Sequence, residues 1–150
     1  MNTVKRAIAL FFVLIMVFAC GCKQADKGVT ISSDSFFDRM IIKNDRVYMI
    51  CYVEFENDAD IEKTFTVKGE SEEDVKNGLL SSKELQCFIL ETDEPASVDE
   101  DNIEGMLKPA EGVEIGAHST GKYYVCFVGD HGNGETKNDR NLPKVLIENQ

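Results

Sequence analysis

The sequence predicts an all-β fold, an antiparallel sandwich of about eight strands with one short helix. Short runs of alternating apolar and polar residues recur at intervals of about ten residues after Val29, and turn-forming residues separate them. Only one segment carries a helix-start pattern, so the helices that connect parallel strands are missing. These observations favour an antiparallel sandwich or barrel over a parallel sheet.

The clearest strand is predicted over residues 46–56, RVYMICYVEFE. Its side chains alternate between two faces, one with Val47, Met49, Cys51, Val53 and Phe55 and the other with Tyr48, Ile50, Tyr52 and Glu54. Residues 36–42 form a second predicted strand. Lys43-Asn44-Asp45 lies between the two strands and supplies a hairpin turn.

Five later segments also have strand character: residues 63–68, 85–91, 113–115, 122–129 and 144–148. The one helix is expected near residues 72–80. Ser71-Glu72-Glu73-Asp74 fits the Ser-x-x-Asp start pattern, and acidic residues in a first turn suit the helix dipole. Val75 and Leu79 give an apolar stripe, and Gly78 limits the helix to about two turns.

Two features of the β segments are similar to an immunoglobulin-type sandwich. Tyr124-Val125-Cys126 resembles the Tyr-x-Cys of the tyrosine corner, and Cys51 lies on an earlier alternating strand. The resemblance implies an immunoglobulin-like sandwich with an inter-sheet disulfide between Cys51 and Cys126. The chain departs from that pattern because it contains no tryptophan.

Three cysteines lie in the expected domain: Cys51, Cys87 and Cys126. An odd number allows at most one internal disulfide and leaves one thiol over. The alternative is that all three are buried thiols that pack as small apolar side chains.

The N-terminal segment differs from the rest of the chain. The first acidic residue is Asp26, whereas Lys5 and Arg6 precede an apolar run over residues 7–20. This arrangement is typical of a secretory signal peptide, and the run is shorter than the roughly 20 apolar residues of a spanning helix. We therefore expect residues 1–19 to be a signal peptide, residues 20–28 a polar tether and residues 29–150 a single domain.

The end of the apolar run resembles the lipobox of bacterial membrane lipoproteins. Val17-Phe18-Ala19-Cys20 has an aliphatic residue three positions before the cysteine, and Ala19-Cys20-Gly21-Cys22 has glycine directly before it. The resemblance implies that a diacylglycerol is attached to the thiol of Cys20, with Cys22 as the alternative, and that the chain is cut just before that residue. The domain would then be held by lipid on the outer face of the cytoplasmic membrane or on another envelope membrane.

Charge and motifs exclude several functions. The chain has 27 acidic and 16 basic residues, a net charge of −11, which argues against a nucleic-acid partner. We find no phosphate loop, nucleophile elbow or metalloprotease motif, so the sequence predicts no enzyme, no catalytic residue, no cofactor and no metal site. Acidic segments at 58–60, 93–94, 99–104 and 130–135 could offer calcium ligands, but none has the EF-hand order, and solvated loops are the default interpretation.

The leading functional hypothesis is a surface-anchored binding or interaction module with a protein or peptide ligand. Loops at the ends of the strands, or an unpaired edge strand, would make the contacts. Two alternatives remain: a calcium- or cell-wall-associated structural module, and an envelope enzyme that uses His118 and His131, the only histidines of the chain. The enzyme hypothesis requires these two side chains to converge on one pocket.

Overall fold

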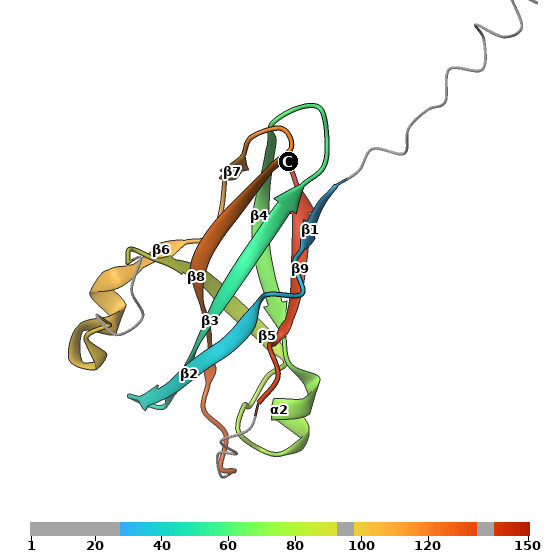
Figure 1. Ribbon diagram of the computed structural model, residues 1–150. Coiled ribbons are helices and arrows are strands. Elements are labelled where there is room, and N and C mark those ends of the chain that lie inside the picture. Colours follow the sequence, from blue (N-terminus) through green and yellow to red (C-terminus); the bar gives the residue numbers. More distant parts are fainter. Residues whose placement is uncertain (1–27, 93–97, 135–139) are drawn as a thin grey trace, which may run out of the picture.

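The computed structural model describes residues 28–92, 98–134 and 140–150 (Figure 1). Its elements, in chain order, are β1 (Val29–Ile31), β2 (Phe36–Lys43), β3 (Arg46–Asn57), β4 (Lys63–Glu70), α2 (Glu72–Lys76), β5 (Glu84–Leu90), the 3-10 helix η2 (Glu100–Met106), β6 (Leu107–Pro109), β7 (Val113–Ile115), β8 (Ser119–Asp130) and β9 (Lys144–Asn149). The predicted mostly β chain with a short helix is confirmed. The predicted signal peptide and the tether up to residue 27 lie outside the described residues.

The strands form one antiparallel sheet that curls strongly into a half-barrel (Figure 1). β1 and β2 both pair with β3, one after the other along its length. β8 also pairs with β3, and β5 and β4 follow β8 in that order. β9 pairs with β4 beyond them. The architecture shown is therefore a single curled, hydrogen-bonded sheet.

The β2–β3 hairpin turns as the sequence predicts. Lys43 pairs with Arg46, so the loop contains two residues, Asn44 and Asp45. Their φ angles are +52° and +57°. Two consecutive positive φ angles characterise the type I′ turn, whose twist matches that of the two strands, and Asn and Asp tolerate this conformation well.

Both faces of the sheet are covered, and β3 contributes to both. The predicted face of β3 from Val47 to Phe55 lies in the inner core, the buried cluster on the concave side. Tyr48 and Ile50 point the other way into the outer core, a second buried cluster. Ile103 of η2, which is fully buried, closes the outer core from the solvent side. The alternation of β3 is therefore confirmed, with apolar contacts on each side.

The helix is shorter than predicted. Ser71 caps α2, which ends at Lys76 because Asn77 is the C-cap and Gly78 has a φ of +82°. A positive φ at this position ends a helix and is adopted most easily by glycine. Val75 is 36% exposed, so the expected apolar stripe is wrong there, and the buried helical residue is Asp74.

β4 and β5 separate soon after they meet. They pair directly only at Gly69 with Leu85 and at Glu70 with Glu84. Further along, Ala110 bridges them: its N–H donates to the Cys87 carbonyl at 3.1 Å, and its carbonyl accepts from the Val67 N–H at 2.9 Å. The segment from β6 to β7 thus fills the widening gap. The sequence pattern did not predict β1 or β6 as separate strands.

Candidate functional site

The predicted cysteine pair lies on neighbouring strands but on opposite faces. β3 and β8 pair along their whole length, and Cys51 faces the inner core whereas Cys126 faces the outer core. All three cysteines of the described part are free thiols. The predicted Cys51–Cys126 disulfide is not formed in the structure, because side chains on opposite faces of a sheet cannot meet. The lipidation candidates Cys20 and Cys22 lie outside the described residues.

The three thiols are poorly suited to chemistry. Burial raises the pKa of Cys87 and of Cys126 to about 12. Burial also raises the pKa of Cys51. A thiol must ionise to act as a nucleophile or a metal ligand, so these side chains serve as small apolar residues.

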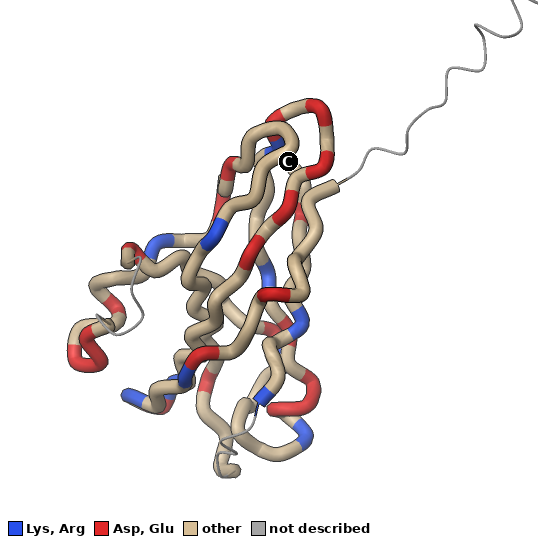
Figure 2. Tube along the Cα trace, in the orientation of Figure 1, with Lys and Arg blue, Asp and Glu red and all other residues tan. Residues whose placement is uncertain are grey.

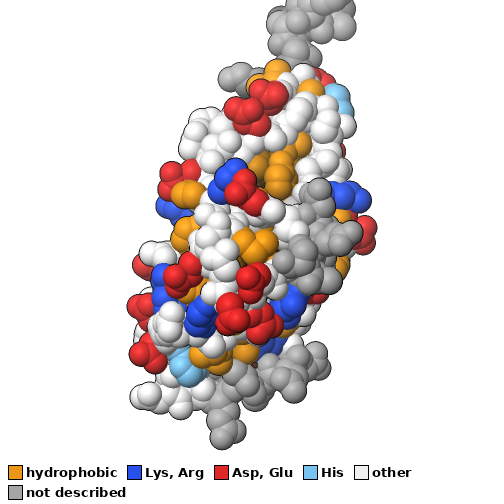
Figure 3. Space-filling view, turned by 90° about the vertical axis from the view of Figure 1, so that its left-hand side faces the viewer, with side chains coloured by type: hydrophobic (Ala, Val, Ile, Leu, Met, Phe, Trp, Pro, Cys, Tyr) orange, Lys and Arg blue, Asp and Glu red, His pale blue; other side chains and the backbone are white. Residues whose placement is uncertain are grey.

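The two histidines do not converge. His118 directly precedes β8 and His131 directly follows it, so the 12 residues of this strand separate them by about 40 Å. His118 Nε2 lies 2.9 Å from Asp60 Oδ1, with both side chains exposed. Histidine side chains reach the surface near both ends of the face drawn in Figure 3. The expectation of one pocket that uses both histidines is therefore contradicted.

The described residues of the predicted acidic loops form no cluster that resembles a metal site. Within residues 28–92, 98–134 and 140–150, no three His, Cys, Asp or Glu side chains are placed to share a metal ion. Asp93, Glu94 and Glu135 lie outside these ranges. Nor does this part of the chain contain a helix with the length and apolar character needed to cross a membrane.

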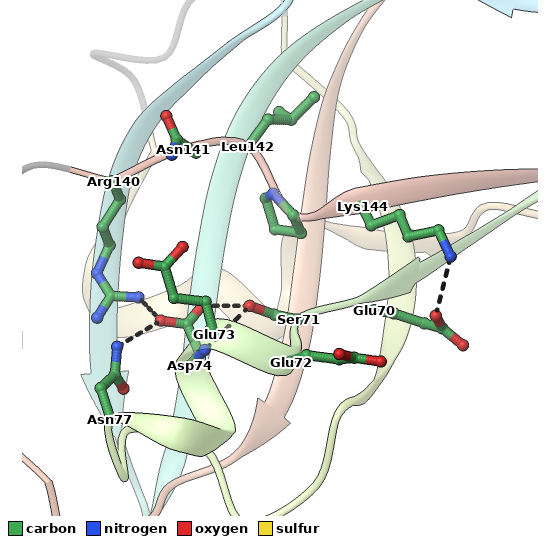
Figure 4. Close-up of a pocket in the computed structure, with 11 residues that line it drawn as sticks. Glu70, Ser71, Glu72, Glu73, Asp74, Asn77, Arg140, Asn141, Leu142 and Lys144 are labelled. Carbon is green, nitrogen blue, oxygen red and sulfur yellow. Dashed lines mark hydrogen bonds and ion pairs between the residues drawn. The ribbon is translucent and has the colours of Figure 1, made fainter.

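A pocket of about 200 Å³ lies between α2 and residues 140–144 (Figure 4). Its centre is the buried carboxylate of Asp74. Ser71 donates its hydroxyl to Asp74 Oδ2 at 2.7 Å, Asn77 donates to Oδ1 at 3.4 Å, and Arg140 forms an ion pair with Oδ1. These partners occupy the carboxylate, so the cluster fixes α2 to the segment that enters β9.

A second polar cluster lies on the outer face of β3 and β8. The Tyr52 hydroxyl donates to Glu54 Oε1 at 2.6 Å, and Lys122 Nζ lies 3.2 Å from the same oxygen. The hydrogen bond from Tyr52 lowers the pKa of Glu54, and the hydrogen bond to Glu54 raises the pKa of Lys122. Both shifts favour an ionised Glu54 carboxylate and a protonated Lys122 at neutral pH.

A larger hollow, the β4–β5 groove, of about 940 Å³, lies on the outer face where these two strands separate. Residues from six strands line it, among them Arg46, Lys68, Gln86, Phe88, Leu146 and Glu148. Lys68 and Glu148 form an ion pair at 2.7 Å on one wall. On the other wall, Arg46 donates to Gln86 Oε1 at 2.6 Å.

Sequence patterns gave no signal for this groove, because its residues come from strands that are far apart in the chain. The one hint came from residues 63–68, where the alternation places polar side chains on the strand face opposite to Phe65 and Val67. The groove exists because of how β4, β5 and β9 are placed in three dimensions.

Comparisons with protein-family models, with curated protein sequences and with solved structures give no match to this chain. The function must therefore be inferred from the chain's own residues and geometry.

Proposed function

We propose that this chain is a lipid-anchored envelope protein whose β-domain is a binding module for a protein or peptide. The observation that carries the proposal is the leader: Lys5 and Arg6, an apolar run, and then Cys20 and Cys22. The first strand of the described sheet begins at Val29, nine residues after Cys20. The domain can thus fold close behind a lipidated cysteine.

The position of β1 gives the domain an orientation. A tether over residues 20–28 reaches at most about 30 Å when fully extended. The chain enters β1 at the end of the molecule where β9 finishes, and the β2–β3 hairpin and α2 lie at the other end (Figure 1). In this proposal the β1 end faces the membrane and the hairpin end points away from it.

The charge of the domain agrees with anchoring by lipid. Acidic residues occur at both ends of the described part, and Lys and Arg are scattered among them (Figure 2). Such a surface is repelled by anionic headgroups, so a covalent lipid must hold it at the membrane. Two acyl chains anchor stably, whereas one binds only marginally.

A binding role is supported by the β4–β5 groove, whose volume of about 940 Å³ lies near the upper end of the range for ligand sites, about 300–1,000 Å³. The likeness to immunoglobulin-type sandwiches, which often bind proteins, rests on the sequence resemblance alone and stays part of the proposal.

Metabolic labelling with a palmitate analogue tests the anchor. The parent chain and the Cys22→Ala variant are expected to incorporate label into the membrane fraction, and Cys20→Ala is expected to lose it. Cys87→Ala is the matched control, because it removes a thiol from the domain and leaves the leader unchanged. Equal labelling of parent and Cys20→Ala/Cys22→Ala would overturn the anchor.

Site-directed photo-crosslinking in intact cells tests the binding module. A crosslinker at Asp45, in the hairpin turn, should give a discrete adduct, whereas one at Ile61, in an exposed loop near the β1 end, should not. Adducts only from Ile61, or none from either position, would contradict a module that presents its outer end to a partner.

A further inference from the structure

We infer that the β4–β5 groove binds an extended peptide segment that carries basic side chains. The inference rests on the proposed binding function and names the surface and the chemistry of its ligand. It is argued from the shape of the groove, from its charge and from its place on the domain.

The floor of the groove offers apolar contact. Phe88 of β5 and Leu146 of β9 are half-buried there, on either side of the separation between the strands, and Pro109 is exposed beside them. Phe88 packs at the edge of the outer core, which holds it in place. The groove is bounded by strands, so a ligand that lies along it is an extended chain.

The charges of the groove are unbalanced. Five acidic side chains line it against two basic ones. Both basic side chains are already engaged, Lys68 with Glu148 and Arg46 with Gln86. Within the described part of the chain, Glu84, Glu111 and Asp130 line the groove without an ion pair.

Three unpaired carboxylates around an apolar floor select for a partner of opposite charge. A basic side chain placed beside them forms new ion pairs, whereas an acidic one is repelled. In an extended peptide, successive side chains point to opposite faces. A peptide with alternating apolar and basic residues can therefore set its apolar face on Phe88 and Leu146 and direct its basic side chains to the rim.

The groove is also accessible from outside the envelope membrane in the proposed orientation. Arg46 and Asp130 pair at the hairpin end of β3 and β8, and β1 pairs with the other end of β3. The 12 residues of β3 separate the two ends by about 40 Å. The end of the groove lined by Arg46 and Asp130 thus lies far from the tether.

Fluorescence anisotropy on the full chain, purified in detergent, tests the inference with defined probes. The probe is a labelled octapeptide of alternating lysine and valine. Two matched octapeptides replace every lysine with serine or with glutamate. We expect the lysine peptide to bind, with an affinity that falls as salt is raised, and the other two to bind at least roughly tenfold more weakly.

Two variants with the same net charge locate the binding surface. E84Q/E111Q/D130N removes the three rim charges, and D34N/E62Q/E114Q removes three exposed acids that lie off the groove. The rim variant should weaken binding of the lysine peptide roughly tenfold, since each exposed pair contributes modestly. The control variant should bind like the parent, and equal melting temperatures show that all three proteins are folded.

The result that overturns the inference is binding that does not depend on the groove: equal loss in both variants, or no preference for lysine over serine. Sedimentation that shows a dimer in the parent and a monomer in the rim variant would make the groove an interface between copies instead. If the parent chain incorporates no palmitate label in cells but the purified chain still binds the lysine peptide, the lipid anchor is refuted and the peptide-binding inference is retained.

Discussion

The buried thiols predict an alkaline loss of stability that depends on each cysteine. Burial raises the pKa of Cys126 from its ordinary value of 9.0 to about 12. A thiol with a raised pKa in the folded state favours folding fully below pH 9, where both states are protonated. As the pH rises above 9, the unfolded chain ionises first, so stability falls until the pH passes about 12.

The size of this effect follows from the two pKa values. Between pH 8 and pH 10, one thiol with a pKa of 9.0 unfolded and about 12 folded lowers the free energy of unfolding by about 1.4 kcal/mol. Cys87 has a similar pKa of about 12, and burial raises the pKa of Cys51 as well. The three thiols together account for a loss of about 4 kcal/mol.

Urea unfolding of the parent and of Cys126→Ala at pH 8 and pH 10 isolates one thiol. Tyrosines and lysines titrate alike in both proteins, so the difference between the two pH losses reports Cys126 alone. We expect the variant to lose about 1.4 kcal/mol less than the parent. If the parent and the variant lose the same free energy of unfolding between pH 8 and pH 10, the Cys126 thiol is not buried. A mass of the intact protein that is lower by two hydrogens would instead reveal a disulfide.

Three substitutions test the packing. Gly78→Ala forces a β-carbon onto a φ of +82° and should cost about 1–2 kcal/mol in urea unfolding. Ile103→Ala should cost about 2–4 kcal/mol and increase hydrogen exchange in η2 before β3, and unchanged exchange in η2 would contradict the outer core. Tyr48→Phe removes the 2.7 Å hydrogen bond to Glu104 and should cost about 1 kcal/mol, and a neutral result would argue against that bond.

Local features of the fold could be predicted from the sequence. The alternation of residues 46–56 placed Val47 and Phe55 on one face and Tyr48 on the other, as the inner and outer cores confirm. Asn44 and Asp45 predicted the hairpin because their side chains tolerate positive φ angles. These signals are readable because each depends on neighbours in the chain.

Non-local features could not be predicted in the same way. Alternation shows that Cys51 and Cys126 each lie on a strand, but it does not show that β3 and β8 are neighbours. The resemblance to a tyrosine corner therefore suggested a disulfide between side chains that face opposite cores. η2 was hidden as well, because one buried residue, Ile103, gives an acidic segment no periodic pattern.

Mass spectrometry of the mature N-terminus tests the central claim most directly. The chain is purified from membranes in detergent and digested with trypsin, which cuts after Lys23. The account predicts a peptide of residues 20–23 that begins at Cys20 and carries a diacylglycerol on that residue. A peptide that retains residues 7–19 ahead of an unmodified Cys20 and Cys22 would contradict it.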